Sequence, residues 1–120
     1  MDDKTKQRQK ELIDQYKKTP KQMGAYCIRN TENNRYFVAC SRDITARFNR
    51  HRMELKMQAD RSSAPLQADW LAFGAQAFSF EVLEELVPLD DLGYDPTDDL
   101  AELESLWIDK LESRAPAGYN

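Results

Sequence analysis

Two polar side chains fall on a helical face that is otherwise apolar, which makes them the first candidates for chemistry. Ile44, Phe48 and Leu55 lie on one side of a predicted helix at about 100° per residue. Arg47 and His51 lie on that same side. Burying an unpaired charge is costly. The pair therefore either points into a cleft beside a sheet or sits at the edge of the apolar stripe, with Arg47 reaching solvent and His51 bonded to a carbonyl.

A predicted helix near the C-terminus carries the opposite charge in a similar place. Glu104 lies in the middle of its apolar arc, whereas Glu102 points away. The arc is formed by Leu100, Leu103, Trp107, Ile108 and Leu111. A carboxylate in such surroundings needs a cation. Glu104 is therefore expected either to pair with Arg47 or to bind a metal ion.

A predicted hairpin supplies a hydroxyl group. If its turn is centred on residues 32–33, Tyr26 lies opposite Ala39 and shares a face with Phe37. Tyr36 then points to the other face. A tyrosine, an arginine, a histidine and a glutamate can thus converge on one surface. This set suits phosphate-ester chemistry, in which one group handles the nucleophile's proton, cations take up the developing charge and a carboxylate binds Mg²⁺.

The elements that must position these residues follow from turn signals and periodicity. Helices are expected over residues 4–18, 43–58, 66–73 and 98–112, and strands over 24–30, 35–41 and 78–86. Asp43 is a plausible N-cap for the second helix, and Gly74 ends the third. The predicted fold class is α+β, a small three-stranded antiparallel sheet flanked by helices, with a basic N-terminal helix in residues 1–22 and one domain in 23–120.

Composition limits the class of protein. A chain of 120 residues with 41% hydrophobic residues suits one domain. It has no apolar run of about 18 residues and no apolar signal core, so we expect neither a membrane protein nor a secreted one. Cys27 and Cys40 are too few for a disulfide framework and suit a reducing cytoplasm. They are expected to be small core side chains, with a reactive thiol at Cys40 as the alternative.

Charge is divided unevenly along the chain. The net charge is -4, which taken alone argues against a nucleic-acid partner. Residues 1–56, however, carry fourteen Lys or Arg against seven Asp or Glu, whereas residues 57–120 carry three against fourteen. A basic half can mark a surface that binds polyanions, and the alternative is an ordinary solvated surface. Any nucleic-acid affinity should be modest and strongly weakened by salt.

Several short segments are weak signals singly but specific in combination. They are Gly24-Ala25-Tyr26, Phe37-Val38-Ala39 followed by Cys40-Ser41-Arg42-Asp43-Ile44, the pair Arg47 and His51, the stretch from Leu66 to Leu83, Glu104 with Ile108, and Gly118-Tyr119-Asn120. In this order and spacing, the chain from about Met23 to Asn120 resembles the GIY-YIG nuclease superfamily.

The resemblance implies a role for each matched residue. Tyr26 would activate the water nucleophile, directly or through His51. Arg47 would bind the scissile phosphate and stabilise its charge. Glu104 would bind a single Mg²⁺ or Mn²⁺ ion that also assists the leaving oxygen. Further substrate contacts and support of the site are expected from Arg42, Arg50 and Asn120.

The chain also departs from the family pattern. Phe37 stands where the second motif has a tyrosine, so one hydroxyl is absent. Tyr36 is adjacent but is expected on the opposite face. Ala39 replaces a glycine and Ala25 an isoleucine. Losing one positioned hydroxyl lowers the rate by roughly 10²- to 10³-fold if it contributed like an oxyanion donor.

These observations lead to three functional hypotheses. The first is a cytoplasmic, divalent-metal-dependent endonuclease or phosphodiesterase acting on nucleic acid, DNA in preference to RNA. It has no separate DNA-binding domain, so its specificity is expected to be low or supplied by a partner protein. The second is a catalytically inactive nucleic-acid-binding module. The third is the same scaffold redirected to a nucleotide or another small molecule.

Overall fold

The computed structural model describes residues 22–87 and 93–120. The elements run in the order β1 (Gly24–Asn30), β2 (Arg35–Ser41), α2 (Ile44–Lys56), α3 (Ala64–Phe73), the short 3₁₀ helix η1 (Ala75–Ala77), β3 (Phe78–Glu85) and α4 (Thr97–Lys110). This is the α+β architecture expected from the sequence. The expected helix over residues 4–18 lies outside the described residues.

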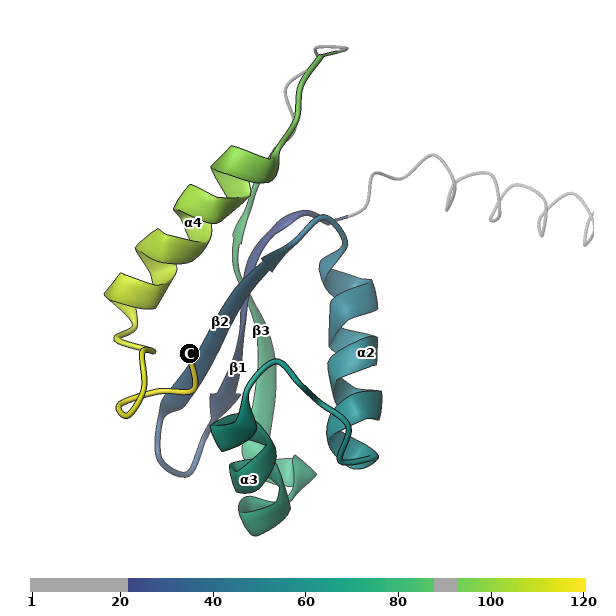
Figure 1. The fold of residues 1–120 in the computed structure, drawn as a ribbon, viewed down its shortest axis with the longest axis vertical. Coiled ribbons are helices and arrows are strands. Elements are labelled where there is room, and N and C mark those ends of the chain that lie inside the picture. The colour runs from purple at the N-terminus through teal and green to yellow at the C-terminus, as the bar shows by residue number, and fades with distance from the viewer. Residues whose placement is uncertain (1–21, 88–92) are drawn as a thin grey trace, which may run out of the picture.

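The three strands form one antiparallel sheet in the order β2-β1-β3, with β1 in the centre. Tyr26 pairs with Ala39 in β2, which confirms the predicted hairpin register. Figure 1 shows α2 and α4 on opposite sides of this sheet. The main apolar core lies on the α2 and α3 side, where Tyr26, Ile28 and Phe37 are buried from the sheet and Leu55 from α2.

Local signals explain where α2 and α3 begin. Asp43 caps α2, because its side chain accepts the backbone N–H of Ala46. Ser63 caps α3 in the same way through the N–H of Leu66. We expected α3 to begin at Leu66, and it begins two residues earlier. The Ser63 cap and the tolerance of a helix's first turn for Pro65 account for the difference.

The first motif glycine is required by the sheet. Gly24 has a φ of +150°, and a Cβ there would lie 2.0 Å from the carbonyl oxygen of Glu84 in β3. The register between β1 and β3 shifts one residue later, between Ala25 and Tyr26. A side chain at this position would therefore push β3 away from β1 beside Tyr26.

The C-terminal segment closes the free edge of β2. The Asn120 amide donates to the carbonyl of Val38 and accepts its N–H, each at 2.8 Å, and the Tyr119 N–H donates to the carbonyl of Tyr36 at 2.9 Å. Figure 1 shows the C-terminal end beside β2. The Tyr119 side chain is buried in the core, so this segment is an integral part of the fold.

The described helices are all too short or too polar to cross a bilayer.

Candidate active site

A chain of hydrogen-bonded side chains joins the sheet to α2 and to the loop that follows it. The Tyr26 hydroxyl lies 2.9 Å from His51 Nε2, and His51 Nδ1 lies 2.9 Å from an Asp60 carboxylate oxygen. The side chains of His51 and Asp60 are 1% and 0% exposed, and Tyr26 is fully buried. His51 can thus occupy a core position, because both of its ring nitrogens have hydrogen-bond partners. Its partner is a carboxylate, not the carbonyl considered from the sequence.

The partners of His51 assign its tautomer. A carboxylate can only accept, so the neutral ring places its proton on Nδ1 and donates it to Asp60. Nε2 then has a free lone pair and accepts a hydrogen bond from the Tyr26 hydroxyl. Carboxylate, imidazole and hydroxyl stand in the same order in enzymes that remove a proton from a nucleophile.

The loop between α2 and α3 holds Asp60 in place. Its second carboxylate oxygen accepts the N–H of Ser62 at 2.7 Å, and its own N–H donates to the side chain of Gln67 at 3.3 Å. Gln67 in turn donates to the carbonyl of Leu55 near the end of α2, at 3.0 Å. These bonds fix the carboxylate against His51, so the two side chains would need little reorganisation to transfer a proton.

Arg47 lies against the Tyr26 hydroxyl. Burial raises the pKa of Tyr26, whereas a hydrogen bond and the positive charge of Arg47 lower it, and the charges of Glu104 and Asp60 raise it. Burial dominates, so the hydroxyl is protonated at neutral pH. The Tyr26 hydroxyl is thus within electrostatic reach of Arg47 and Glu104, in addition to its contact with His51.

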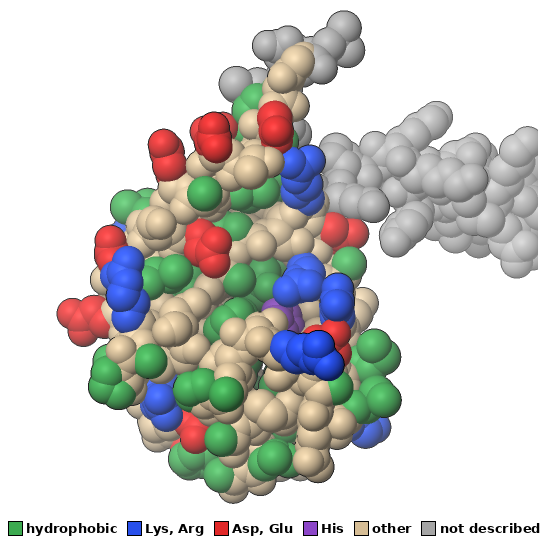
Figure 2. Space-filling view, viewed as in Figure 1, with side chains coloured by type: hydrophobic (Ala, Val, Ile, Leu, Met, Phe, Trp, Pro, Cys, Tyr) green, Lys and Arg blue, Asp and Glu red, His purple; other side chains and the backbone are tan. Residues whose placement is uncertain are grey.

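Basic side chains line a cavity between α2 and the loop that follows it. A polar cavity of about 420 Å³ is lined by Arg47, Arg50 and Glu54 of α2 and by Ala59, Arg61 and Ser62 of the following loop. Figure 2 shows Lys and Arg side chains gathered around the histidine, while acidic side chains lie mainly over α4. Arg50 is paired with Glu54 at 2.7 Å. The cavity can accept an anion, and a phosphate is the anion that suits arginine.

Glu104 is a half-buried carboxylate on α4. Burial raises its pKa. No hydrogen bond or ion pair joins it to another residue in the ranges 22–87 and 93–120, so the Arg47–Glu104 pair considered from the sequence does not form. An unpaired, partly desolvated carboxylate fits a divalent cation, and Mg²⁺ commonly uses one or two carboxylates with water and substrate phosphate. The described residues include no cluster of three or more metal-binding side chains.

The remaining predicted site residues have structural partners. Asn120 uses both ends of its amide on Val38, beside the strand position of Phe37. Arg42 contacts Asp95 and Thr97, each at 2.8 Å, and so joins the start of α2 to the start of α4. The Phe37 ring packs edge-on against His51, with ring centres 5.6 Å apart.

The two cysteines are free thiols and not a disulfide. Burial raises the pKa of each to about 12, and the negative charge of Glu81 adds to this at Cys27 and that of Glu104 at Cys40. Both remain protonated at neutral pH, which disfavours the reactive thiol considered for Cys40.

Sequence reasoning missed Asp60 and Arg61. Both lie in a loop, where no periodicity shows which way a side chain points. Arg61 could have been noticed as an isolated basic residue in an acidic half, where Lys110 and Arg114 are the other two. Asp60 gave no comparable signal, because its contact with His51 depends on the path of the loop.

Known proteins are similar to this chain in sequence and in fold. The sequence is 34% identical over 97 residues to the intron-associated endonuclease 1 of Enterobacteria phage T4, a match that covers 81% of this chain and 36% of that protein. Two structures of the catalytic domain of the homing endonuclease I-TevI, one of them a mutant, superpose with TM-scores of 0.68 and 0.70 at 31% identity. Each covers 82% of this chain, which in turn covers 96% and 92% of those domains.

No established family profile matches the sequence. The likeness to the catalytic domains nevertheless spans nearly their whole length at more than 30% identity. It agrees with the motifs in β1, β2, α2 and α4 and with the residues that those elements bring together. The chain belongs to the GIY-YIG nuclease superfamily.

Proposed function

We propose that this chain hydrolyses phosphodiester bonds in nucleic acid with the help of one divalent metal ion. Membership of a nuclease superfamily supports a nuclease broadly. The observation that supports the finer proposal is the buried chain Tyr26–His51–Asp60 beneath an arginine-lined cavity. Both ring nitrogens of His51 have partners, and the Asp60 carboxylate orients the ring so that Nε2 can accept a proton from the Tyr26 hydroxyl.

The proton path follows from the assigned tautomer. A water molecule attacks the phosphorus, and the bond between phosphorus and the leaving nucleoside oxygen breaks. The water gives its proton to the Tyr26 oxygen as the hydroxyl proton passes to His51 Nε2, and the leaving oxygen takes up a proton from solvent. Asp60 stabilises the resulting imidazolium, and the positive charge of Arg47 favours the negative charge that develops on the Tyr26 oxygen. Because burial raises the pKa of Tyr26, the hydroxyl needs both neighbours to lose its proton at neutral pH.

The hydroxyl that would take the proton is buried. Tyr26 is 0% exposed and His51 only 1%, and Arg47 is close enough to the hydroxyl to lower its pKa. A substrate phosphate offers Arg47 two charged acceptors in place of one neutral oxygen. We infer that the guanidinium turns toward the phosphate and so opens a path for the nucleophilic water. Arg61 is positioned in the same cavity for a second phosphate contact.

Glu104 would bind the metal ion. When bound, Mg²⁺ or Mn²⁺ would neutralise charge on the phosphate and on the leaving oxygen. The protein would contribute a single carboxylate. Glu104 is partly buried and is not paired with a neighbouring cation among the residues that the structure describes, so its oxygens are available to the metal ion. The other ligands would be water and phosphate oxygens.

The substrate is proposed to be DNA rather than RNA, and a partner protein to supply sequence specificity. The T4 relative is named an intron-associated endonuclease, and this chain spans 36% of its length. In the described part of the chain, arginines that can contact phosphates line one cavity. Such contacts position a duplex but read no sequence.

A second candidate is nucleic-acid binding without cleavage. Phe37 favours it, because the second motif has lost its hydroxyl beside His51. Under this alternative, the basic surface is used and the buried hydrogen-bond chain only stabilises the fold.

Incubation of supercoiled plasmid with the purified protein and Mg²⁺ or Mn²⁺ tests the proposal. We expect nicked circles, none in EDTA and none with Glu104→Gln. Glu102→Gln is the matched control, because it removes the same charge from an exposed position of α4. Plasmid binding that is unchanged by EDTA and never accompanied by nicking would favour the second candidate. Equal nicking by Glu104→Gln and wild type would refute the metal site.

A further inference from the structure

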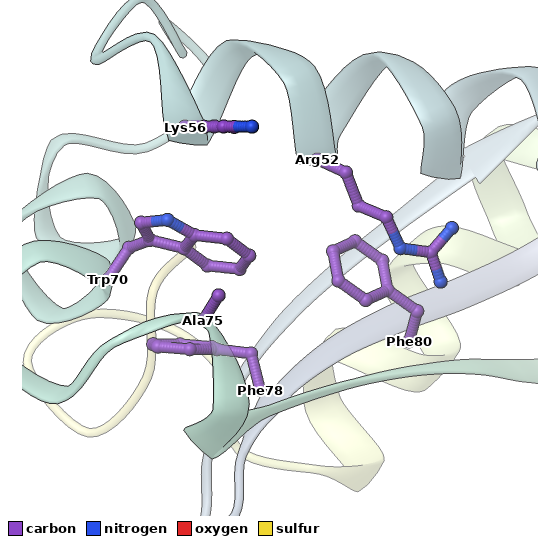
Figure 3. A pocket seen from close by; sticks show the side chains of 6 residues that line it. All are labelled: Arg52, Lys56, Trp70, Ala75, Phe78 and Phe80. Carbon is purple, nitrogen blue, oxygen red and sulfur yellow. The ribbon is translucent and has the colours of Figure 1, made fainter.

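A second cavity lies on the other side of α2. It has a volume of about 540 Å³ and is lined by Arg52, Lys56, Trp70, Ala75, Phe78 and Phe80. These residues come from α2, α3, η1 and β3, so the cavity is formed where the two helices meet the free edge of the sheet (Figure 3). None of them belongs to the active site described above.

Aromatic rings form the wall and floor of this cavity. The Trp70 and Phe78 rings lie 5.0 Å apart at 33°, and Trp70 and Phe80 are 6.3 Å apart in an edge-on arrangement. Trp70 and Phe80 are only partly buried. Their faces therefore offer a flat apolar surface that a planar ring can stack on.

Two unpaired cations stand beside the aromatic surface. The Arg52 guanidinium lies 4.2 Å from the centre of the Phe80 ring, and Lys56 lies on α2 above Trp70 (Figure 3). No carboxylate among residues 22–87 and 93–120 forms an ion pair with either of them. Arg50 on the opposite flank of α2, by contrast, is paired with Glu54. The cavity thus combines stacking faces with positive charge that is available to an anion.

The two cavities lie on the two flanks of one helix. At 100° per residue, Arg47 and Arg50 fall on one side of the buried stripe of α2, and Arg52 and Lys56 fall on the other. A helix with its side chains is about 10–12 Å across. A single flexible strand that crosses α2 can therefore reach both cavities at once.

We propose that this cavity binds an unpaired nucleobase of single-stranded nucleic acid. The base stacks against Trp70, and the flanking phosphates contact Arg52 and Lys56. A ligand that is both planar and anionic matches the aromatic faces and the charges together, as in proteins that bind single strands. The inference rests on the proposed function in one respect, since nucleic acid is taken to be the substrate, and it adds that the strand is unpaired on the Trp70 side of α2.

The binding test uses the full-length Glu104→Gln protein in EDTA, so that no cleavage occurs. The probes are a fluorescently labelled dT12 strand, the same strand with abasic sites in place of its bases, and the dT12·dA12 duplex. We expect Trp70→Leu to weaken binding of dT12 by roughly tenfold, the order of one base–aromatic stack. It should leave binding of the abasic strand and of the duplex unchanged.

Lys56→Gln provides a variant whose folding is not at risk, because the residue is exposed. It should weaken the binding of all three probes. It should also lower the magnitude of the slope of log affinity against log salt by about one. Lys110→Gln is the matched control, because Lys110 is an exposed cation over the Trp107 ring on α4. It should change neither quantity.

If Trp70→Leu loses equal affinity for the normal and the abasic strand, or loses affinity for neither, the assignment of the cavity to a nucleobase is overturned. If Trp70→Leu does not fold, unchanged affinity and salt slope in Lys56→Gln would also overturn it. The plasmid-nicking assay reports the proposed function separately. Base-dependent binding without nicking would refute the proposed nuclease activity and support the base-binding cavity. Nicking without base-dependent binding would support the nuclease activity and refute the base-binding cavity.

Discussion

Asp60→Asn should move the ring proton of His51 from one nitrogen to the other, with little change in the shape of the side chain at position 60. One carboxylate oxygen of Asp60 already accepts the Ser62 N–H at 2.7 Å, so the amide oxygen stays there and the amide NH₂ group faces His51 Nδ1. Two N–H groups cannot face one another, and His51 must move its proton to Nε2. Nε2 then donates to Tyr26 and no longer accepts a proton from it.

The size of the effect follows from these contacts. Stability should fall by about 1–2 kcal/mol, because a buried charge-assisted hydrogen bond becomes a neutral one. Cleavage should fall by about 10²- to 10⁴-fold, the range for general-base catalysis and for a wrong histidine tautomer in serine proteases. The rate loss is thus far larger than the loss of folded protein.

His51 is the single histidine of the chain, which makes its tautomer directly measurable. In untagged protein, ¹⁵N NMR of the ring should show the proton on Nδ1 in wild type and on Nε2 in Asp60→Asn. Single-turnover cleavage of a labelled oligonucleotide gives the rate. Asp69→Asn is the control, because Asp69 is a partly buried carboxylate that contacts Arg35 and Tyr119 and not His51. It should keep the wild-type tautomer and a rate within about threefold of wild type, a margin well below the loss given by a wrong tautomer.

Two results would refute this reasoning. A wild-type His51 with its proton on Nε2 would show that the assigned hydrogen-bond direction is wrong. A tautomer change in Asp60→Asn with a nearly wild-type cleavage rate would show that His51 does not accept the proton of Tyr26.

Three further predictions concern the rest of the site. Because burial raises the pKa of the metal-free Glu104 carboxyl, cleavage at subsaturating Mg²⁺ should be lost on acidification at a higher pH than an exposed glutamate would give; pH–rate profiles at subsaturating Mg²⁺ measure this, and an acid limb in the ordinary glutamate range would contradict it. Phe37→Tyr should raise the single-turnover rate by up to about 100-fold, and an unchanged rate would mean that the missing hydroxyl does not limit the chemistry. Asn120→Ala should lower the free energy of unfolding in urea by about 1–3 kcal/mol, since it removes both hydrogen bonds to Val38, and no loss would show that water replaces them fully.

The sequence predicted the parts of the site that lie on regular elements. Tyr26 could be placed opposite Ala39 because side chains alternate along a strand and a short turn fixes the register. Arg47, His51 and Glu104 could be recognised because helical periodicity put polar groups where apolar ones were expected. Periodicity is a property of the backbone, so it carries over directly from sequence to structure.

The parts that could not be predicted depend on loops and on contacts between distant segments. Asp60 meets His51 only because Gln67 and Ser62 fix the path of the loop between α2 and α3. The aromatic cavity combines Trp70 and Phe80, which share no element. Whether Glu104 would pair with Arg47 also depended on the packing of α4, which a single sequence does not determine.

Crystals of the protein grown with Mn²⁺ and a slowly cleaved phosphorothioate DNA test the proposed site most directly. The anomalous scattering of manganese should give one peak at the carboxylate of Glu104, with a backbone phosphate against Arg47 and beside the Tyr26 hydroxyl. A manganese ion bound elsewhere, or a phosphate that leaves Arg47 against Tyr26, would contradict the proposed site.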